Sequence, residues 1–134
     1  MHFRFKPIAG RTGEMVDRLM ESEDIPSSQD IRFKVRLALE EVLENVVSYA
    51  YADGQGYLDA ETILDREHEV LRIVIRDSGI PFNPLLKADP DLSLPLEERP
   101  VGGLGIFLCK QLMDGVSYCH EDGCNVLTLV KKLN

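Results

Sequence analysis

The segment formed by residues 27–51 constrains the fold more than any other part of the chain, because its apolar residues recur at helical spacing. It begins after Pro26 with Ser27 and Asp30, an S-x-x-D pattern that is typical of a helix N-terminus. One face collects the apolar side chains, which are Ile31, Val35, Leu39, Val42, Val46 and Ala50. An apolar face of this width must be buried, so we expect a long helix that packs against a sheet.

The remaining sequence supplies that sheet and two more helices. In chain order, the predicted elements are a strand at 2–8, helices at 10–23 and 27–51, strands at 58–65 and 70–76, an irregular proline-rich segment at 83–101, a helix at 104–114, and strands at 116–120 and 125–133. This order predicts a two-layer α/β sandwich, an α+β fold in which helices cover a mostly antiparallel sheet. Since 134 residues suffice to bury one core, we expect a single domain over residues 1–134.

The amino-acid composition argues against nucleic acid as a partner and indicates the cellular compartment. The net charge is −8 and no stretch is rich in Lys and Arg, so the sequence lacks the basic surface that binds nucleic acid. It has no apolar run long enough to cross a membrane and no N-terminal signal stretch, and we therefore expect a cytoplasmic protein. We expect Cys109, Cys119 and Cys124 to be reduced and buried, because an odd cysteine count without an export signal argues against disulfides.

Glu41 and Asn45 stand out within the long helix. They are four residues apart and therefore lie on one line, between the apolar face and the charged face. An amide oxygen is a ligand for Mg²⁺, and a carboxylate can take the proton of an attacking hydroxyl group. The alternative is that both side chains lie at the helix edge and face water.

The strand at 70–76 ends in a second polar motif, Asp77-Ser78-Gly79. A carboxylate at a strand end can accept a hydrogen bond from the amino group of adenine, and Gly79 would let the base lie against the backbone. The same residue types also form ordinary strand-ending turns, so the motif alone leaves both interpretations open.

A third motif, Gly102-Gly103-Leu104-Gly105, lies between the proline-rich segment and the last helix. Free N–H groups and the helix dipole at such a position favour an anion such as a polyphosphate. A flexible hinge is the alternative. The pattern is neither a P-loop nor a dinucleotide-binding fingerprint.

In this order, the three motifs resemble those of the GHKL ATP-binding superfamily, which has a Bergerat-type fold with a mixed, mostly antiparallel sheet. The strings ALEEVLENVVSYAY, IRDSGIPFNP and GGLGIFLCKQLMDGVSY are most similar to bacterial anti-sigma factor serine kinases. The resemblance extends from about Gly10 to Leu133. It implies that ATP and Mg²⁺ are the cofactors and that residues 83–101 form an ATP lid.

The resemblance also implies roles for individual residues. Glu41 corresponds to the general base and Asn45 to the Mg²⁺ ligand. Asp77 and Gly79 correspond to the residues that hold the adenine. Four further positions complete the implied nucleotide site, with Gly102, Gly103 and Gly105 at the phosphates and Thr128 near the adenine. For Thr128, an ordinary place in a strand is an equal alternative.

A serine/threonine protein kinase is the activity that the resemblance implies. Such a kinase would hold a sigma factor and phosphorylate an antagonist of the STAS-domain type, and the family leads us to expect homodimers. The alternative is an ATP-binding regulatory module that switches partners without phosphoryl transfer. A histidine kinase catalytic domain is disfavoured, because the sequence has no dimerisation helix with a phospho-accepting histidine.

Overall fold

The computed structural model describes residues 1–8, 10–50, 56–86, 93 and 104–134. In chain order, its elements are β1 (His2–Phe5), α1 (Thr12–Met20), α2 (Gln29–Asn45), a π-helical turn (Val46–Ala50), β2 (Leu58–Asp65), β3 (Val70–Asp77), a 3-10 turn (Pro84–Leu86), α3 (Leu104–Leu112), β4 (Gly115–Glu121) and β5 (Cys124–Lys132). This order confirms the succession of helices and strands that the sequence predicts.

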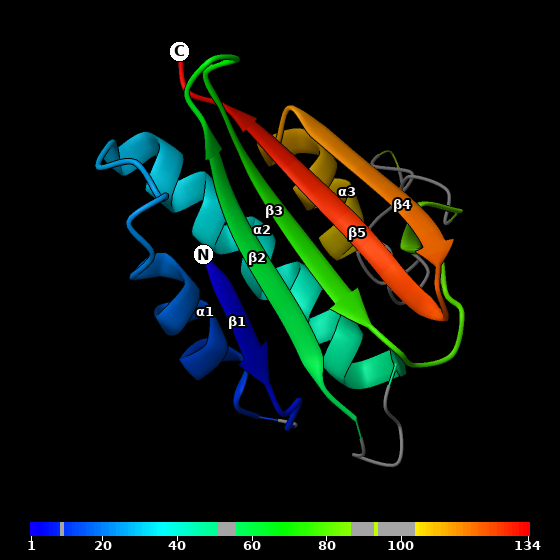
Figure 1. Cartoon of the computed structure of the whole chain (residues 1–134). Coiled ribbons are helices and arrows are strands. Elements are labelled where there is room, and N and C mark those ends of the chain that lie inside the picture. The colour runs from blue at the N-terminus through cyan, green and yellow to red at the C-terminus, as the bar shows by residue number, and fades with distance from the viewer. Residues whose placement is uncertain (9, 51–55, 87–92, 94–103) are drawn as a thin grey trace.

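The five strands form one sheet in the order β1-β2-β3-β5-β4, and each of the four pairings is antiparallel. The last strand of the chain therefore lies inside the sheet, between β3 and β4 (Figure 1). The register pairs Asp77 of β3 with Asn125 of β5. Two polar side chains from distant parts of the chain thus meet at one end of the sheet.

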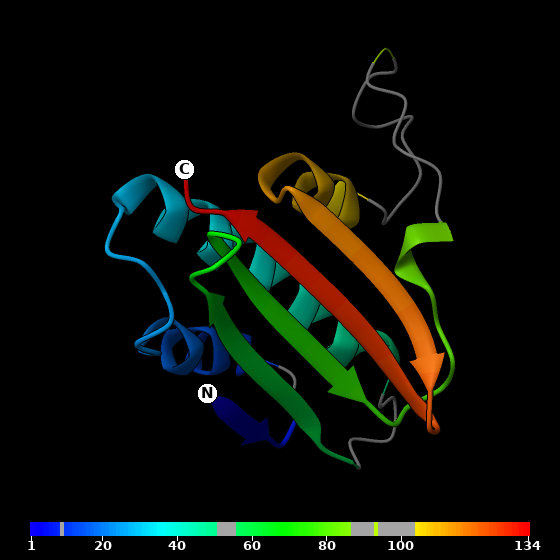
Figure 2. The ribbon, with the colours of Figure 1, turned by 45° about the horizontal axis from the view of Figure 1, so that its top comes forward.

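The three α-helices lie on one face of the sheet and leave the other face uncovered (Figure 1, Figure 2). Alternate residues of β3 point toward the helices, and Leu71, Ile73 and Ile75 are 1% exposed or less. They belong to one core with the apolar sides of α1 and α2, represented by Leu19 and Leu39. This two-layer α+β arrangement confirms the predicted fold class, although the described strands form a wholly antiparallel sheet and not the expected mixed one.

The N-terminus of α2 differs from its prediction by one residue. The N-cap is Ser28, whose Oγ accepts a hydrogen bond from the backbone N–H of Ile31 (3.4 Å). The predicted cap at Ser27 is therefore wrong, because two adjacent serines offer the same side chain and the structure uses the second.

The C-terminus of α2 changes its helical pitch. The α-helix ends at Asn45 and the chain continues as the π-helical turn Val46–Ala50. The predicted last residue of this helix, Tyr51, lies outside the described residues. π turns within helices are frequent at functional sites, and this one begins directly after a predicted site residue.

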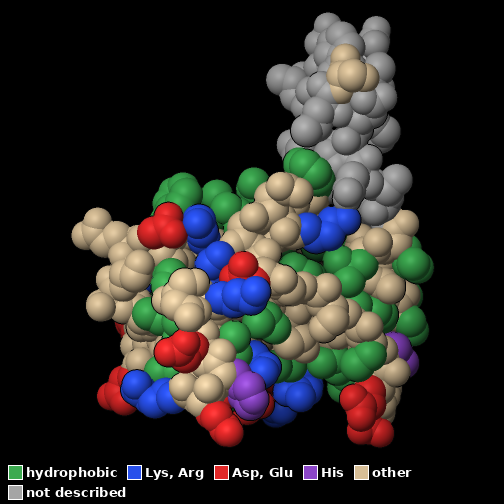
Figure 3. Space-filling model, turned by 90° about the horizontal axis from the view of Figure 1, so that it is seen from above, with side chains coloured by type: hydrophobic (Ala, Val, Ile, Leu, Met, Phe, Trp, Pro, Cys, Tyr) green, Lys and Arg blue, Asp and Glu red, His purple; other side chains and the backbone are tan. Residues whose placement is uncertain are grey.

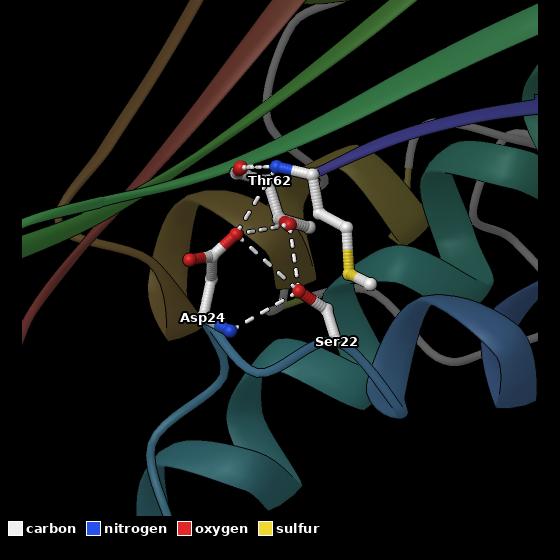
Figure 4. A network of polar contacts seen from close by, with 4 residues as sticks. Ser22, Asp24 and Thr62 are labelled. Carbon is white, nitrogen blue, oxygen red and sulfur yellow. Dashed lines mark hydrogen bonds and ion pairs between the residues drawn. The ribbon is translucent and has the colours of Figure 1, made fainter.

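A polar cluster fastens β2 to the connection between α1 and α2 (Figure 4). Oδ2 of Asp24 accepts hydrogen bonds from the Thr62 hydroxyl (2.8 Å) and the Met1 ammonium (3.2 Å), and Ser22 Oγ lies 2.8 Å from the Thr62 hydroxyl. Burial by itself would raise the pKa of Asp24, but these hydrogen bonds outweigh burial and lower that pKa. An ionised carboxylate therefore holds the cluster together.

The three cysteines are free, but only Cys109 is buried. Cys119 of β4 is exposed and Cys124 of β5 is half-buried. Each is the strand neighbour of a residue that points toward the helices, so each points to the uncovered face of the sheet. The expectation of buried cysteines is therefore wrong for these two.

Charged side chains of both signs are mixed on the surface. On the face shown in Figure 3, Lys and Arg side chains are interspersed with Asp and Glu side chains. Among the helices that the structure describes, none combines the length and the apolar character that a membrane span requires.

Candidate functional site

A pocket opens between the end of α2, the end of β3, the start of β5 and the start of α3. Among the described residues, apolar side chains form most of its walls, and the polar lining residues are Asn45, Asp77, Tyr118 and Asn125. It encloses about 440 Å³ of empty space, a figure that includes open solvent at its mouth. Two predicted site residues, Asn45 and Asp77, therefore line the same pocket although 32 positions separate them in the sequence.

Asp77 is the last residue of β3 and is 7% exposed. Its Oδ1 accepts two hydrogen bonds, from the backbone N–H of Gly79 (3.0 Å) and from Nδ2 of Asn125 (2.9 Å). The bond from Gly79 is a local turn of the kind that Asp favours, in which the side chain binds the N–H two residues on. Both donors reach Oδ1, so neither occupies Oδ2, and the carboxylate can accept a further hydrogen bond from a ligand.

Asn125 faces Asp77 across the β3–β5 pairing, and the sequence did not reveal it as a site residue. Its amide also binds the backbone of the loop after β3, through the C=O of Ile80 (2.9 Å) and the N–H of Phe82 (3.1 Å). The hydroxyl of Tyr118 on β4 donates to its Oδ1. In the sequence, Asn125 is notable only because strand alternation predicts that it points toward the helices at the start of β5. That observation identifies a site residue only when β5 is known to pair with β3.

Thr128 does not reach the pocket. Asn125 and Leu127 of the same strand line it, and the side chains of a strand alternate between the two faces of a sheet. Thr128 therefore lies on the uncovered face, where it pairs with Val74. The prediction that places Thr128 near the adenine is wrong in this fold, and Asn125 holds the position beside Asp77.

Glu41 lies one helical turn before Asn45 on α2, and its carboxylate packs against the first turn of α3. A Cβ atom added at Gly105 would lie 2.3 Å from Oε2 of Glu41, far inside van der Waals contact. A side chain at this position would therefore displace the Glu41 carboxylate from where it lies. A second contact joins the same two helices, because Sγ of Cys109 donates to the C=O of Ala38 (3.3 Å).

Cys109 lies behind this contact and is chemically inert. Burial raises its pKa to about 12, and the negative charge of Glu41 acts in the same direction. The thiol therefore stays protonated at neutral pH and does not act as a nucleophile. Among the described residues near the pocket, the carboxylates of Glu41 and Asp77 and the amide of Asn45 are suited to chemistry.

Part of the predicted site lies outside the described residues. Gly102 and Gly103 are among these positions, together with most of the predicted lid at 83–101. The described start of that segment is the 3-10 turn Pro84–Leu86, and Pro84 lines the pocket. Gly79 is described, and its backbone N–H holds Asp77 as stated above.

Comparison with known families decides where this arrangement belongs. Residues 10–131 match the histidine kinase-like ATPase domain family, and this span includes every predicted site residue from Glu41 to Thr128. The chain belongs to that family.

Two curated relatives of this ATPase domain are protein kinases by name. The serine/threonine-protein kinase BtrW of Bordetella bronchiseptica is 33% identical over 102 residues, which are 76% of this chain and 71% of that protein. The serine-protein kinase RsbW of Bacillus cereus is 31% identical over 124 residues, which cover 90% of this chain and 68% of that protein.

A solved structure has the same fold. It is the histidine kinase domain of a blue-light activated histidine kinase from Erythrobacter litoralis EL346, with a TM-score of 0.59 at 17% sequence identity. The match covers 92% of this chain and 58% of that one. At this identity the likeness supports the fold alone.

The described residues of this ATPase domain fit an adenine nucleotide with a Mg²⁺ ion. Ile75 and Leu127 supply apolar walls suited to a flat base, and Asp77 supplies an acceptor for its amino group. Asn45 lines the same pocket from α2. An amide oxygen there can ligate Mg²⁺, which takes its other ligands mainly from phosphates and water.

Proposed function

We propose that this protein is a serine/threonine protein kinase that uses Mg·ATP. The observation that carries the proposal is the pocket in which Asp77 and Asn45 lie together, with Glu41 one helical turn away. The names of two relatives, BtrW and RsbW, support the same activity, because both are called protein kinases.

Each residue of the nucleotide site has a separate task in this kinase. Asp77 accepts a hydrogen bond from the adenine amino group, and Asn45 supplies an oxygen ligand for Mg²⁺. Gly105, in the first turn of α3, holds the phosphates together with Gly102 and Gly103. Bound Mg²⁺ supplies charge neutralisation for the phosphate oxygens.

Glu41 is the general base of the proposed reaction. It takes the proton of a serine or threonine hydroxyl while the γ-phosphoryl group passes from ATP to that oxygen and ADP leaves. Glu41 lies one helical turn before the proposed metal ligand Asn45, and its carboxylate contacts Gly105 in the first turn of α3, so it would lie near the phosphates that these residues hold. Few groups are needed, because phosphoryl transfer depends mainly on positioning and charge neutralisation.

The proposed substrate is a regulatory protein of the STAS-domain type, and the second proposed partner is a sigma factor or a similar regulator. Support for these partners comes from the sequence resemblance to anti-sigma factor serine kinases. We also propose that the chain is one domain with an ATP lid at 83–101, and that it acts in the cytoplasm as a homodimer.

Titration calorimetry with Mg·ATP tests the nucleotide site. Asp77→Asn replaces one acceptor oxygen with an N–H group that would face the adenine amino group. We expect ATP affinity to fall by about tenfold or more, which is roughly 1.4 kcal/mol. Asp59→Asn, on β2 at the uncovered face, is the matched control and should keep the affinity. An unchanged affinity in Asp77→Asn would remove the basis for the site.

A measurement of phosphoryl transfer distinguishes the proposed kinase from the alternative, a regulatory module that uses ATP only to select its partner. Glu41→Gln keeps the side-chain size but removes the base, so it should bind ATP and lower the transfer rate by about 10²-fold or more. The measurement uses partners retained by the protein from native cells, incubated with ATP and mapped for phosphoserine and phosphothreonine. If the unaltered protein phosphorylates none of the partners that it retains, the module without transfer is the better description.

A further inference from the structure

The side-chain amide of Asn125 has a fixed orientation, because its two backbone partners differ in kind. The N–H of Phe82 can only donate and lies 3.1 Å from Oδ1, whereas the C=O of Ile80 can only accept and lies 2.9 Å from Nδ2. This orientation turns Nδ2 toward Oδ1 of Asp77, 2.9 Å away. The loop backbone thus determines that Asn125 donates to Asp77.

The protein itself uses the whole hydrogen-bonding capacity of this amide. Nδ2 donates to Asp77 and Ile80, and Oδ1 accepts from Phe82 and from the hydroxyl of Tyr118. An amide has two N–H donors and two acceptor lone pairs, so these four bonds leave no capacity for a ligand. Asn125 therefore acts on the pocket through its neighbours.

Those neighbours are the groups that a base would meet. Asn125 and Gly79 both donate to Oδ1 of Asp77, which fixes the rotamer of the carboxylate and directs Oδ2 to other partners. Phe82, whose backbone Asn125 also holds, lines the same pocket. A rigidly held acceptor in a buried site discriminates strongly against a ligand that lacks the matching donor.

We propose that Asn125 is a positioning residue that gives the pocket its selectivity for a base with an exocyclic amino group. The inference rests on the proposed function, because it takes this pocket to be the base site. The ligand class is an adenine nucleotide, and the competitor that it excludes is a nucleotide with a carbonyl oxygen at the same position.

Dissociation constants for ATP and ITP, measured by calorimetry, test the selectivity. ITP has a carbonyl oxygen where ATP has the amino group. The unaltered protein should bind ATP about tenfold or more tightly than ITP. Asn125→Asp keeps the shape but loses both N–H donors and puts a second carboxylate beside Asp77, so the preference should fall below about threefold. A folded Asn125→Asp variant with the parental ATP/ITP ratio overturns the proposal.

Two neighbouring variants keep the test decisive. Tyr118→Phe removes one donor to Oδ1 of Asn125 and should lower the ATP/ITP preference by about twofold to threefold. Ser117→Ala, the adjacent residue on the uncovered face of β4, is its control and should change nothing. If the substitutions of Asn125 do not fold, a parental ratio in Tyr118→Phe overturns the proposal instead.

Backbone hydrogen exchange without nucleotide distinguishes this inference from the proposed function. Asn125→Ala should speed exchange of the Phe82 N–H by about tenfold or more, whereas Ile73 in the centre of β3 should stay protected. Unchanged exchange at Phe82 overturns the positioning role even if ATP binds. If exchange at Phe82 is faster in Asn125→Ala but the unaltered protein binds neither ATP nor ITP, the proposed function is refuted, and the selectivity role with it.

Discussion

At the scale of single residues, the contact between Glu41 and Gly105 separates the requirements of folding from those of catalysis. The atom that crowds position 105 is the far end of a flexible side chain. The fold can therefore tolerate a methyl group there, because Glu41 can rotate away. A general base cannot tolerate this movement, since proton transfer needs the base within hydrogen-bonding reach.

Gly105→Ala is the substitution that tests this separation. We expect the free energy of unfolding to change by less than about 1 kcal/mol, because alanine favours a helix and offsets the crowding. The transfer rate should fall by about tenfold or more because Glu41 is displaced. Urea denaturation and phosphorylation assays on the same preparation provide both numbers. A variant with the parental transfer rate would show that the position of Glu41 does not matter for catalysis.

Thr128→Val tests which residue of β5 belongs to the site. Thr128 lies on the face opposite Asp77, so the loss of its hydroxyl should leave ATP affinity within about twofold of the parent. Calorimetry under the conditions used for Asp77→Asn checks this. A loss comparable with that of Asp77→Asn would mean that β5 has a different register when ATP is bound.

Glu41, Asn45 and Asp77 were accessible from the sequence because each motif combines a side chain with a local context that suits its chemistry. The structure brings Asn45 and Asp77 to one pocket and puts Glu41 beside it. Asn125 and Thr128 were not distinguishable in this way, because only the pairing of β5 with β3 determines which of them faces Asp77.

At the scale of elements, α2 connects the fold to the site, since it covers the sheet and carries Glu41 and Asn45. Its N-terminus depends on a single side-chain cap, the hydrogen bond from the N–H of Ile31 to Ser28 Oγ. Ser27 directly precedes the N-cap and lies outside the helix. The two serines therefore differ in their contribution although the sequence presents them as equals.

Ser28→Ala and Ser27→Ala are a matched pair that measures the cap. Ser28→Ala should lower the free energy of unfolding by about 1 kcal/mol, because one N–H at the helix start loses its partner. Ser27→Ala should change it by less than about 0.5 kcal/mol, as surface substitutions usually do. Chemical denaturation of both variants gives the comparison. Equal losses in the two would show that the cap is shared between them.

Element types and their order were predictable because apolar periodicity differs clearly between helices and strands. The hairpin of β4 and β5 was also predictable, since Asp122 and Gly123 favour the positive φ values (53° and 77°) that a tight two-residue turn requires. The π-helical turn after Asn45 was not predictable, because VVSYA has no pattern that distinguishes it from an α-helix. The insertion of β5 beside β3 was not predictable either, since chain order does not determine neighbours in a sheet.

At the scale of the whole molecule, the cluster around Asp24 couples stability to pH. The pKa of Asp24 lies below its ordinary value of 3.8, so the folded protein binds fewer protons than the unfolded chain in acid. This contribution to stability is complete well above the unfolded pKa of 3.8, from about pH 5, and is lost as the pH falls through the folded pKa. Because the cluster joins β2 to the α1–α2 connection, its protonation weakens a contact between the sheet and the helical layer.

Asp24→Asn tests this coupling. The parent should lose stability between about pH 5 and pH 2, and the variant should lose less over the same range, because it has no carboxylate at this position to protonate. Thr62→Val, which removes one hydrogen bond to the carboxylate, should give an intermediate dependence. Urea denaturation at a series of pH values measures the three slopes. Identical slopes in parent and Asp24→Asn would place the acid sensitivity elsewhere.

The uncovered face of the sheet also offers a natural attachment point for a fluorescent label. Cys119 is exposed on the edge strand β4, directly after Tyr118, whereas Cys109 is buried and its pKa is raised to about 12. Cys124 is half-buried and would be a second reactive thiol, so it is first replaced by serine. In that variant, a thiol-reactive dye should couple to Cys119 and leave Cys109 unmodified. The dye would lie on the face of β4 opposite the pocket, one residue from the pocket-lining Tyr118. It would therefore report nucleotide binding without entering the pocket.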